Sequence, residues 1–343
     1  MVKSFKHVRY RGKKRLAPVY YPEEAYSYVI FKEGDTYYAK NGKTREVEYK
    51  SSDASEVINS AVNIEEGGKI VLLSDVEITS TITLDKRVVL DLCGHVMKSV
   101  SVFSPMLQIL ENEVIVKDGI LNSNWRNEVC VEVKSKHTVL QNLRIEHPAQ
   151  GVKYNAEETW LAWNVVINCL LYDVKYGVET TGTYKNNALF IKNTHIGCRG
   201  KTVSGGYGIK LGSGESIFID SSIENVETGI IIDGSYGVNA RLRCENIGTV
   251  VQNNYNSPDN PHVIEIIFAT GVDNYANDYT NLILKRPSGI DHLASDYGGN
   301  FTNFTPPSGY EGRILVVADT NPTNPAQRLY VYINGTWRYV DLT

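Results

Sequence analysis

The chain has 343 residues, of which 42% are hydrophobic and 22% are charged, and these values are ordinary for a globular protein with a large core. Its 35 basic and 39 acidic residues give a net charge of −4, so the total charge implies neither nucleic acid nor a membrane surface as a partner. No apolar run approaches the roughly 18 residues of a membrane span, and we expect no membrane insertion.

The basic residues are concentrated at the N-terminus. Residues 1–17 contain no acid and seven cations, which are Lys3, Lys6, Arg9, Arg11, Lys13, Lys14 and Arg15. Basic arms can bind nucleic acid, but we favour a terminal arm that docks on a neighbouring protein, and we expect no nucleic acid partner. The arm is not followed by the apolar core of a signal peptide, so we do not expect export by the standard route. Virion components are proteins that act outside a cell without such a signal.

Two elements are expected before the main part of the chain. Residues 26–50 alternate at period two around Glu33-Gly34-Asp35 and Asn41-Gly42, which predicts a small β-meander. Asp53 then precedes apolar residues at helical spacing, namely Ala54, Val57, Ile58, Ala61 and Val62. We expect a short amphipathic helix there that covers the open edge of the first coil.

A strand pattern then recurs at a nearly constant interval. Its blocks centre on Leu90, Val116, Leu140, Ile167, Ile191, Ile219 and Leu242, at intervals of 26, 24, 27, 24, 28 and 23 residues. A second set of short strands opens at Gly151, Gly177, Gly208, Gly229 and Thr249. No helical segment separates the two sets, and repeats of this size bury their apolar faces only by stacking. The sequence therefore predicts an all-β fold, a right-handed single-stranded parallel β-helix.

The segment that opens the repeats resembles a known family. The helix from Asp53, then Gly67-Gly68-Lys69-Ile70-Val71-Leu72, then Val88-Val89-Leu90-Asp91-Leu92 and Gly94-His95-Val96 are similar to the N-terminal segment of pectin-lyase-like β-helix proteins. That group includes polysaccharide lyases and hydrolases as well as viral tail spikes and receptor-binding proteins. The resemblance covers residues 53 to about 270, and it implies the fold without selecting one activity.

The C-terminal part differs in character. Residues 263–268 are expected to be the last coil or its cap, and residues 273–310 to be irregular. Residues 313–317 predict a strand, and residues 328–333 and 336–340, around Asn334-Gly335, predict a hairpin. Residues 329–337 are similar to terminal segments of phage and archaeal-virus tail proteins, and residues 31–42 to archaeal-virus β-helix proteins. We expect three parts: residues 1–50 for attachment, 51–270 as the β-helix with its capping helix, and 271–343 as an irregular segment with a β-hairpin cap.

Two outward columns of the repeat receive a structural interpretation. Asp91, Lys117, Gln141, Asn168, Lys192, Asp220 and Arg243 are expected to form a solvated charge ladder. Asp118, Asn142, Cys169, Asn193, Ser221 and Cys244 fall at a tight turn, where an asparagine-ladder-like feature is expected. We do not interpret Asn193-Thr194-His195 as catalytic. The five cysteines, Cys93, Cys130, Cys169, Cys198 and Cys244, contain no CxxC motif or Cys/His cluster, so we expect buried reduced thiols and no metal site.

Two carboxylates are candidate catalytic residues. On the second strand set Glu179 faces outward, and Asp233 closes a following strand. Carboxylates on nearby coils of a groove can act as general acid and base in glycoside cleavage. However, a β-helix of this size exposes several carboxylates at such spacings by chance. The motif set of polygalacturonases and the aspartates of the pectate lyase calcium site are both missing from the sequence.

Aromatic residues on the predicted loops are candidate ligand-binding residues. They are Trp125, Trp160, Trp163, Tyr184 and Tyr207. Loops on a rigid scaffold commonly carry recognition, but the same rings could pack the flank of the solenoid or a trimer interface, and both interpretations stay open. Exposure of Trp160 would favour a ligand platform.

We expect a virion spike or tail-fibre-like protein that binds a host surface carbohydrate or receptor through the β-helix face. Two alternatives stay open: a polysaccharide lyase or glycoside hydrolase that depolymerises a glycan, and a structural virion or surface protein without a ligand. A homotrimer is expected, in contact with other virion proteins through the basic arm and without a cofactor. The expected location is the virion, outside the cell when mature.

Overall fold

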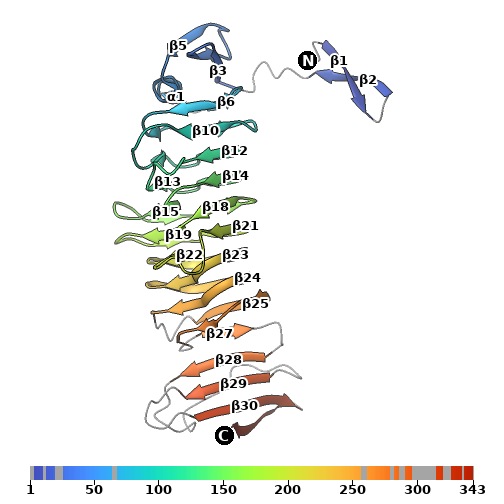
Figure 1. Cartoon of the computed structure of the whole chain (residues 1–343), viewed down its shortest axis with the longest axis vertical. Helices are drawn as coiled ribbons and strands as arrows, with labels where there is room; N and C mark the ends of the chain where they lie inside the picture. The colour runs from blue at the N-terminus through green and yellow to red at the C-terminus, as the bar shows by residue number, and fades with distance from the viewer. Residues whose placement is uncertain are drawn as a thin grey trace.

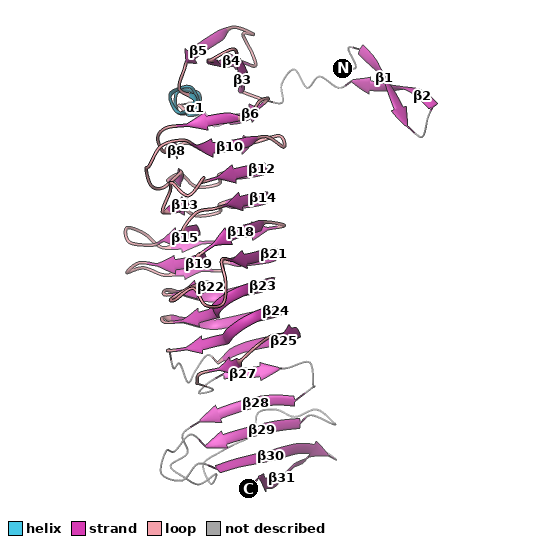
Figure 2. Ribbon diagram, viewed as in Figure 1, coloured by secondary structure: helices cyan, strands magenta, loops and turns pink. Residues whose placement is uncertain are grey.

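The structure is a computed structural model, which describes residues 4–10, 13–19, 26–63, 68–255, 261–278, 282–285, 290–295, 314–319, 326–333 and 336–342. The strands from β6 to β27 stack one above another in a column (Figure 1). Strands predominate throughout the described chain, as Figure 2 shows, and α1 is the helix at one end of the column. Strands in successive coils pair in parallel, which confirms the predicted parallel β-helix. Among the described residues no helix is long and apolar enough to cross a membrane.

Three parallel sheets form the walls of the solenoid. The first sheet contains β3 (Tyr28–Glu33), β6 (Gly68–Leu72), β9 (Val88–Asp91), β17 (Val165–Ile167), β27 (Leu282–Lys285) and the first parts of β12 (Ile115–Asn122), β14 (Val139–Glu146), β21 (Phe190–Cys198), β23 (Gly214–Ile232), β24 (Ser235–Asn253) and β25 (His262–Thr270). The second contains β7 (Val76–Ile78), β10 (Val96–Ser99), β18 (Leu170–Val174) and later parts of the same long strands. The third contains β8 (Ile82–Leu84), β11 (Leu107–Ile109), β13 (Val129–Val133), β15 (Gln150–Asn155), β19 (Tyr176–Thr181), β22 (Tyr207–Leu211), β26 (Asn274–Ala276) and the ends of β23 and β24. Beside the third sheet, β16 (Leu161–Ala162) and β20 (Asn186–Asn187) pair with each other.

Alternate side chains of each strand point into the solenoid and stack in columns. In the first sheet the inward column is Ile70, Leu90, Val116, Leu140, Val166, Ile191, Ile219, Ala240, Ile264 and Leu284, and each is buried. Burying one such branched side chain contributes about 1.5–3 kcal/mol relative to leaving it exposed. The continuous core is therefore shared by all coils, as expected for repeats that cannot fold singly.

The structure corrects the predicted register at three places. Val166, not Ile167, pairs with Leu140. The sequence prediction was wrong here because Val165, Val166 and Ile167 are all apolar, so the pattern does not show which of them points inward. Similarly, Ala240 rather than Leu242 pairs with Ile219. In consequence Ile167 and Arg241, rather than Asn168 and Arg243, belong to the outward column that contains Lys192 and Asp220.

The third correction lies in the third sheet. Thr249 pairs with Thr228, so the residue beside Gly229 is Val250, whose carbonyl oxygen would lie 2.7 Å from a Cβ at that glycine. The close backbone approach at Gly229 explains why a glycine occurs there.

An asparagine ladder turns the chain from the first sheet to the second. Asp118, Asn142, Asn168 and Asn193 adopt left-handed backbone with φ of 59°, 52°, 54° and 47°. Each Nδ2 donates to the preceding coil, at 2.7 Å from Asn142 to Asp118, 3.2 Å from Asn168 to Asn142 and 2.8 Å from Asn193 to Asn168. The predicted ladder is confirmed for Asp118, Asn142 and Asn193, with Asn168 in the position expected for Cys169. Ser221 and Cys244, which were also expected in it, are buried and lie outside the ladder. It ends at Asn193, where the register shifts and the next coil has no paired counterpart.

The N-terminal end of the solenoid is covered by a helix and a small meander. Helix α1 (Ala54–Val62) begins after Asp53, whose carboxylate accepts a hydrogen bond from the Ser55 backbone N–H at 2.8 Å. Its buried face is Ala54, Ser55, Val57, Ile58, Ala61 and Val62, which confirms the predicted helix. The predicted meander is formed by β3, β4 (Thr36–Asn41) and β5 (Val47–Ser51), and β3 pairs in parallel with β6. The meander therefore extends the first sheet beyond β6.

The two chain ends are hairpin-like. Strands β1 (Ser4–Tyr10) and β2 (Lys13–Val19) pair antiparallel within the expected basic arm. At the other end, β28 (Ile290–Ser295), β29 (Ile314–Asp319), β30 (Ala326–Ile333) and β31 (Thr336–Leu342) follow β27. The pairing of Ile333 with Thr336 confirms the predicted hairpin, whereas its Asn334-Gly335 turn lies outside the described residues. The solenoid continues beyond residue 270 through β26 and β27, so residues 273–310 are not irregular throughout.

Four of the five free cysteines are buried, and Cys93 is exposed. Burial raises the pKa of the Cys169 thiol to about 11 and the pKa values of Cys198 and Cys244 to about 12. Cys130 shows a shift in the same direction. These thiols therefore stay protonated near neutral pH, as expected for core side chains, whereas Cys93 departs from that expectation.

We predict that Asn168→Ala lowers the free energy of unfolding by about 1–3 kcal/mol. The substitution removes the ladder hydrogen bonds, and alanine lacks the polar side chain that helps asparagine to adopt positive φ. Chemical unfolding followed by circular dichroism measures the change. Asn168→Gly is the matched control, because glycine adopts positive φ without strain and loses only the ladder contacts. Its free energy of unfolding should therefore fall by less. Equal losses for both variants would contradict a contribution from backbone conformation.

We also predict that a thiol reagent at about pH 8 modifies Cys93 alone in the folded protein, because the other four thiols are buried and protonated. Intact-mass spectrometry counts the adducts, and unfolding in denaturant should raise the count from one to all five cysteines. Rapid labelling of Cys169 or Cys244 in the folded protein would be inconsistent with the packed core.

Candidate functional site

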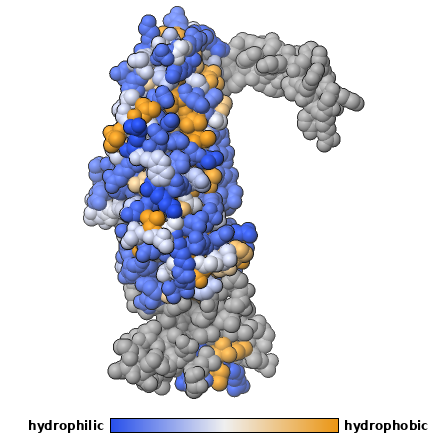
Figure 3. Space-filling model, in the orientation of Figure 1, coloured by the Kyte–Doolittle hydropathy of each residue, from blue (hydrophilic) through white to orange (hydrophobic). Residues whose placement is uncertain are grey.

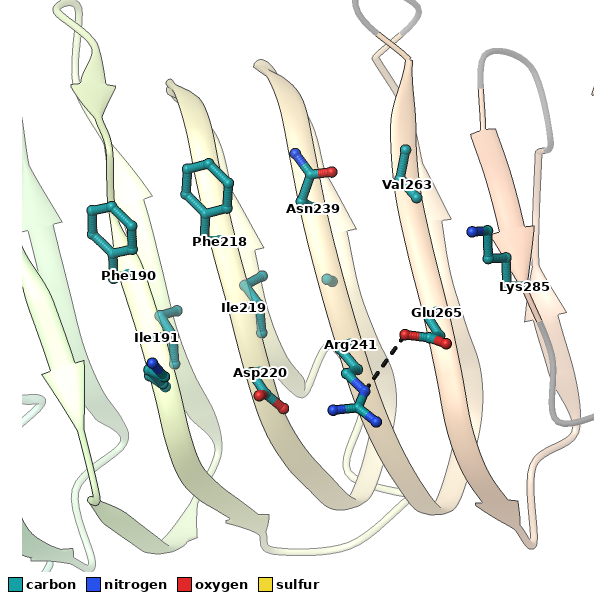
Figure 4. Close-up of a pocket in the computed structure, with 12 residues that line it drawn as sticks. Phe190, Ile191, Phe218, Ile219, Asp220, Asn239, Arg241, Val263, Glu265 and Lys285 are labelled. Atoms are coloured by element: carbon teal, nitrogen blue, oxygen red, sulfur yellow. Dashed lines mark ion pairs between the residues drawn. The ribbon is translucent and has the colours of Figure 1, made fainter. Parts of the chain in front are cut away.

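The outer face of the first sheet carries an aromatic ladder. Phe190 of β21 and Phe218 of β23 pair directly in register, and their rings stack with centroids 5.2 Å apart and planes 8° apart (Figure 4). Trp163, which follows β16, stacks on Phe190 with centroids 6.2 Å apart and planes inclined by 22°. Trp163 is 60% exposed and Phe218 is 42% exposed. Three rings on successive coils thus form a platform along the solenoid axis.

A charged column runs beside this ladder. Two residues further along each strand, Lys192, Asp220, Arg241, Glu265 and Lys285 pair in sequence across neighbouring coils and alternate in sign. Arg241 Nε lies 3.5 Å from Glu265 Oε2, the contact drawn as a dashed line in Figure 4. Both side chains are about half exposed, so this ion pair stays accessible to water and to a ligand.

Phe190 and Phe218 of the ladder, together with the charged column, border a hollow of about 420 Å³, which we call the groove. Phe190, Phe218, Asn239 and Val263 lie in one row across neighbouring strands, with the charged side chains on the other side (Figure 4). An apolar wall with a few convergent polar groups is the usual composition of a ligand site. The described part of the face seen in Figure 3 is mainly hydrophilic, with separate apolar patches.

The five aromatic candidates from the sequence occupy different environments. Trp163 belongs to the ladder, and Trp160 and Tyr184 are 47% and 40% exposed on loops joined by the pairing of β16 with β20. Trp125 is 55% exposed, but its ring stacks on His147 at 4.8 Å and lies 4.2 Å from the Arg199 guanidinium. Their role in binding stays a prediction.

Tyr207 differs from the other candidates because it is only 7% exposed. Its ring stacks on Tyr176 with centroids 4.7 Å apart. Burial, together with the neighbouring Glu179 carboxylate, raises the pKa of its hydroxyl well above the usual range. Tyr207 therefore offers no open ring face, because β22 brings it into the third sheet rather than leaving it on a loop.

The ladder residues Phe190 and Phe218 were missed by the sequence analysis. The signal was nevertheless present, since Ile191 and Ile219 were assigned inward and the residues before them must then point outward. Two outward phenylalanines in consecutive repeats indicate an exposed pair.

The two candidate catalytic carboxylates share one cation. Lys210 Nζ lies 3.6 Å from Glu179 Oε1 and 3.6 Å from Asp233 Oδ2. Glu179 also accepts a hydrogen bond from Gln150 Nε2 at 2.8 Å, and Asp233 accepts one from Asn254 Nδ2 at 2.6 Å. Both carboxylates are thus already paired, which is how a structural ion network is built, and their catalytic role stays a prediction.

No protein-family model matches the chain, and no curated protein matches it. One solved structure, described as Geobacillus virus E2 ORF18, aligns with 84% of this chain and 73% of that chain at 12% identity and a TM-score of 0.42. So low a TM-score carries no argument about fold or function. The protein is a parallel β-helix protein by its own strand pairing, and the resemblance to pectin-lyase-like proteins stays a prediction.

We predict that Lys210→Met lowers the free energy of unfolding by about 1–3 kcal/mol, because Glu179 is then left largely buried without its cation. Thermal and urea unfolding measure the loss. Glu265→Gln is the matched control, since it removes the exposed pair with Arg241 and should change stability by no more than about 0.5 kcal/mol. A larger loss in the control than in Lys210→Met would refute the interpretation of a structural network.

Proposed function

We propose that the chain is a virion spike-like attachment protein that holds an extended surface carbohydrate in the groove. The observation that supports this most is the exposed stack of Trp163, Phe190 and Phe218 beside a charged column. Sugar rings have an apolar C–H face that suits an aromatic platform, and a hydroxyl edge that suits charged and amide side chains.

The direction of the ladder favours a polymer over a compact ligand. Its rings repeat from coil to coil, so successive sugar units can follow the solenoid axis across several strands. Lys192, Arg241 and Lys285 can pair with acidic groups of the polysaccharide. Asp220 and Glu265 can accept hydrogen bonds from its hydroxyl groups. An acidic polysaccharide is therefore the preferred ligand class.

Carbohydrate binding accounts for the groove without requiring Glu179 and Asp233 to act as an acid and a base. A lyase or glycoside hydrolase needs an acid and a base that are free to exchange protons, and Glu179 and Asp233 are both paired with Lys210. A virion setting is supported by the basic residues of the N-terminal hairpin, which pairs with no other described strand and suits docking on a partner protein. The proposed assembly is a homotrimer.

The outward column that contains Phe190 and Phe218 gives a reason to expect copies of the protein to associate. Towards the N-terminus it stays apolar, with the partly exposed residues Val89, Ile115, Val139 and Val165. A second copy could cover this stretch and would compete with a carbohydrate if it also covered the ladder. Light scattering of the purified protein measures its mass and distinguishes a monomer from a trimer.

We predict that Phe218→Ala and Trp163→Ala each weaken retention on polygalacturonate by about tenfold, equivalent to about 1.4 kcal/mol, because each removes one ring of the platform. Affinity electrophoresis or calorimetry measures the affinity. Tyr172→Ala is the control, because Tyr172 is an exposed aromatic of the second sheet outside the groove.

Equal weakening by Tyr172→Ala would indicate non-specific adhesion. Lack of retention on any acidic or neutral polysaccharide by the unaltered protein would overturn the proposal and leave a structural virion part as the better account.

A further inference from the structure

A serine, a histidine and a glutamate meet on the outer face of the second sheet. His195 of β21 lies between two side chains of β23, with its Nδ1 2.7 Å from Ser222 Oγ and its Nε2 3.2 Å from Glu224 Oε1. Whichever ring nitrogen carries the proton, one faces a hydroxyl and the other faces a carboxylate. An imidazole between a serine and a carboxylate can activate the hydroxyl while the carboxylate orients the ring. The ring nitrogens are exchanged relative to a Ser-His-Asp triad, in which Nε2 faces the serine and Nδ1 faces the carboxylate.

The strand register creates this cluster. The register shifts at Asn193, so that His195 pairs with Ser222 and Gly197 pairs with Glu224. Without the shift, outward-facing His195 would lie opposite Ile223, which points into the core. Gly197 has no side chain, and a Cβ there would lie 3.4 Å from both Glu224 Oε1 and His195 Nε2. Glu224 therefore has room to turn back towards the ring.

The cluster is open to a substrate. The His195 and Glu224 side chains are 37% and 31% exposed, and His195, Ser222 and Arg243 line a hollow of about 520 Å³. Arg243 pairs with Ser222 in register, so a guanidinium is carried by the next coil. A cation at that place can stabilise negative charge that develops on a carbonyl oxygen.

This second hollow adjoins the groove, because Asp220 and Arg241 line both. A polysaccharide held on the aromatic ladder would thus present its substituents next to Ser222. Acyl groups on sugar hydroxyls are the substituents that a serine nucleophile can remove.

We propose that Ser222, His195 and Glu224 form a serine esterase site that removes acyl groups from an O-acylated carbohydrate. The choice of carbohydrate as substrate rests on the proposed function of the groove, whereas the nucleophile and its base do not. The earlier interpretation of Asn193-Thr194-His195 as non-catalytic is revised for His195, because its partners lie on the following coil.

In the first step Ser222 Oγ attacks the ester carbonyl carbon and His195 accepts the hydroxyl proton. The bond from the carbonyl carbon to the sugar oxygen breaks, and His195 returns the proton to that oxygen, so the sugar leaves as an alcohol. Water then attacks the acyl-serine and gives a proton to His195, which passes it to Ser222 Oγ as the carboxylic acid departs. Glu224 stabilises the imidazolium in both steps, and water is the only co-reactant.

The nucleophile is tested with a fluorophosphonate probe and peptide mass spectrometry. We expect covalent labelling of Ser222 in the folded protein, and a decrease of about 100-fold or more in the labelling rate in Ser222→Ala and His195→Gln. Ser204→Ala and His95→Gln are the controls: Ser204 is an exposed loop serine, and His95 pairs with Asp75 at 3.3 Å several coils away. Circular dichroism verifies that each variant is folded. Absence of labelling at Ser222 would overturn the proposal.

The substrate class is tested by acetate release from chemically O-acetylated polygalacturonate, with retention measured on the same polymer. Release that is lost in Ser222→Ala while retention persists supports the proposal. Retention without labelling or release overturns the esterase and leaves the binding function standing. Labelling of Ser222 without retention or release supports the nucleophile but overturns both the carbohydrate substrate and the proposed role of the groove.

Discussion

Parallel hydrogen bonding between successive coils is the interaction on which the rest of this structure depends. It places equivalent residues about 4.8 Å apart, so any side chain that recurs at one position becomes a ladder. This one spacing produces the apolar column inside, the asparagine ladder at the turn and the stacked rings of Phe190 and Phe218. A slip of one residue would move each of these sets to the opposite face.

The irregularity at Asn193 shows how a local change in pairing alters which side chains meet on the outer face. Before it, Lys192 pairs with Asp220 and the charged column continues; after it, His195 pairs with Ser222. The same shift ends the asparagine ladder, because the following coil has no residue opposite Asn193. A bulge of this kind re-aims side chains without disturbing the core, where Ile191 and Ile196 both stay fully buried.

The core and the proposed binding surface use opposite faces of the same strands. The inward residues are buried and shared by neighbouring coils, whereas Trp163, Phe218 and Arg241 are exposed and contribute little to the core. The outer face can therefore hold both the groove and the cluster of Ser222, His195 and Glu224, with Asp220 and Arg241 common to their two hollows. Exposed positions on a rigid scaffold are where recognition is expected.

The sequence by itself determined the repeat, the parallel β-helix, the capping helix after Asp53 and the C-terminal hairpin, because each depends on local periodicity or turn chemistry. Only the tertiary structure decided which residues meet across coils. The consecutive apolar residues Val165-Val166-Ile167 left the register open, Tyr207 proved buried, and the partners of His195 lie 27 and 29 residues further along the chain. Such contacts depend on the length of every intervening turn and on each bulge, and local patterns do not specify these.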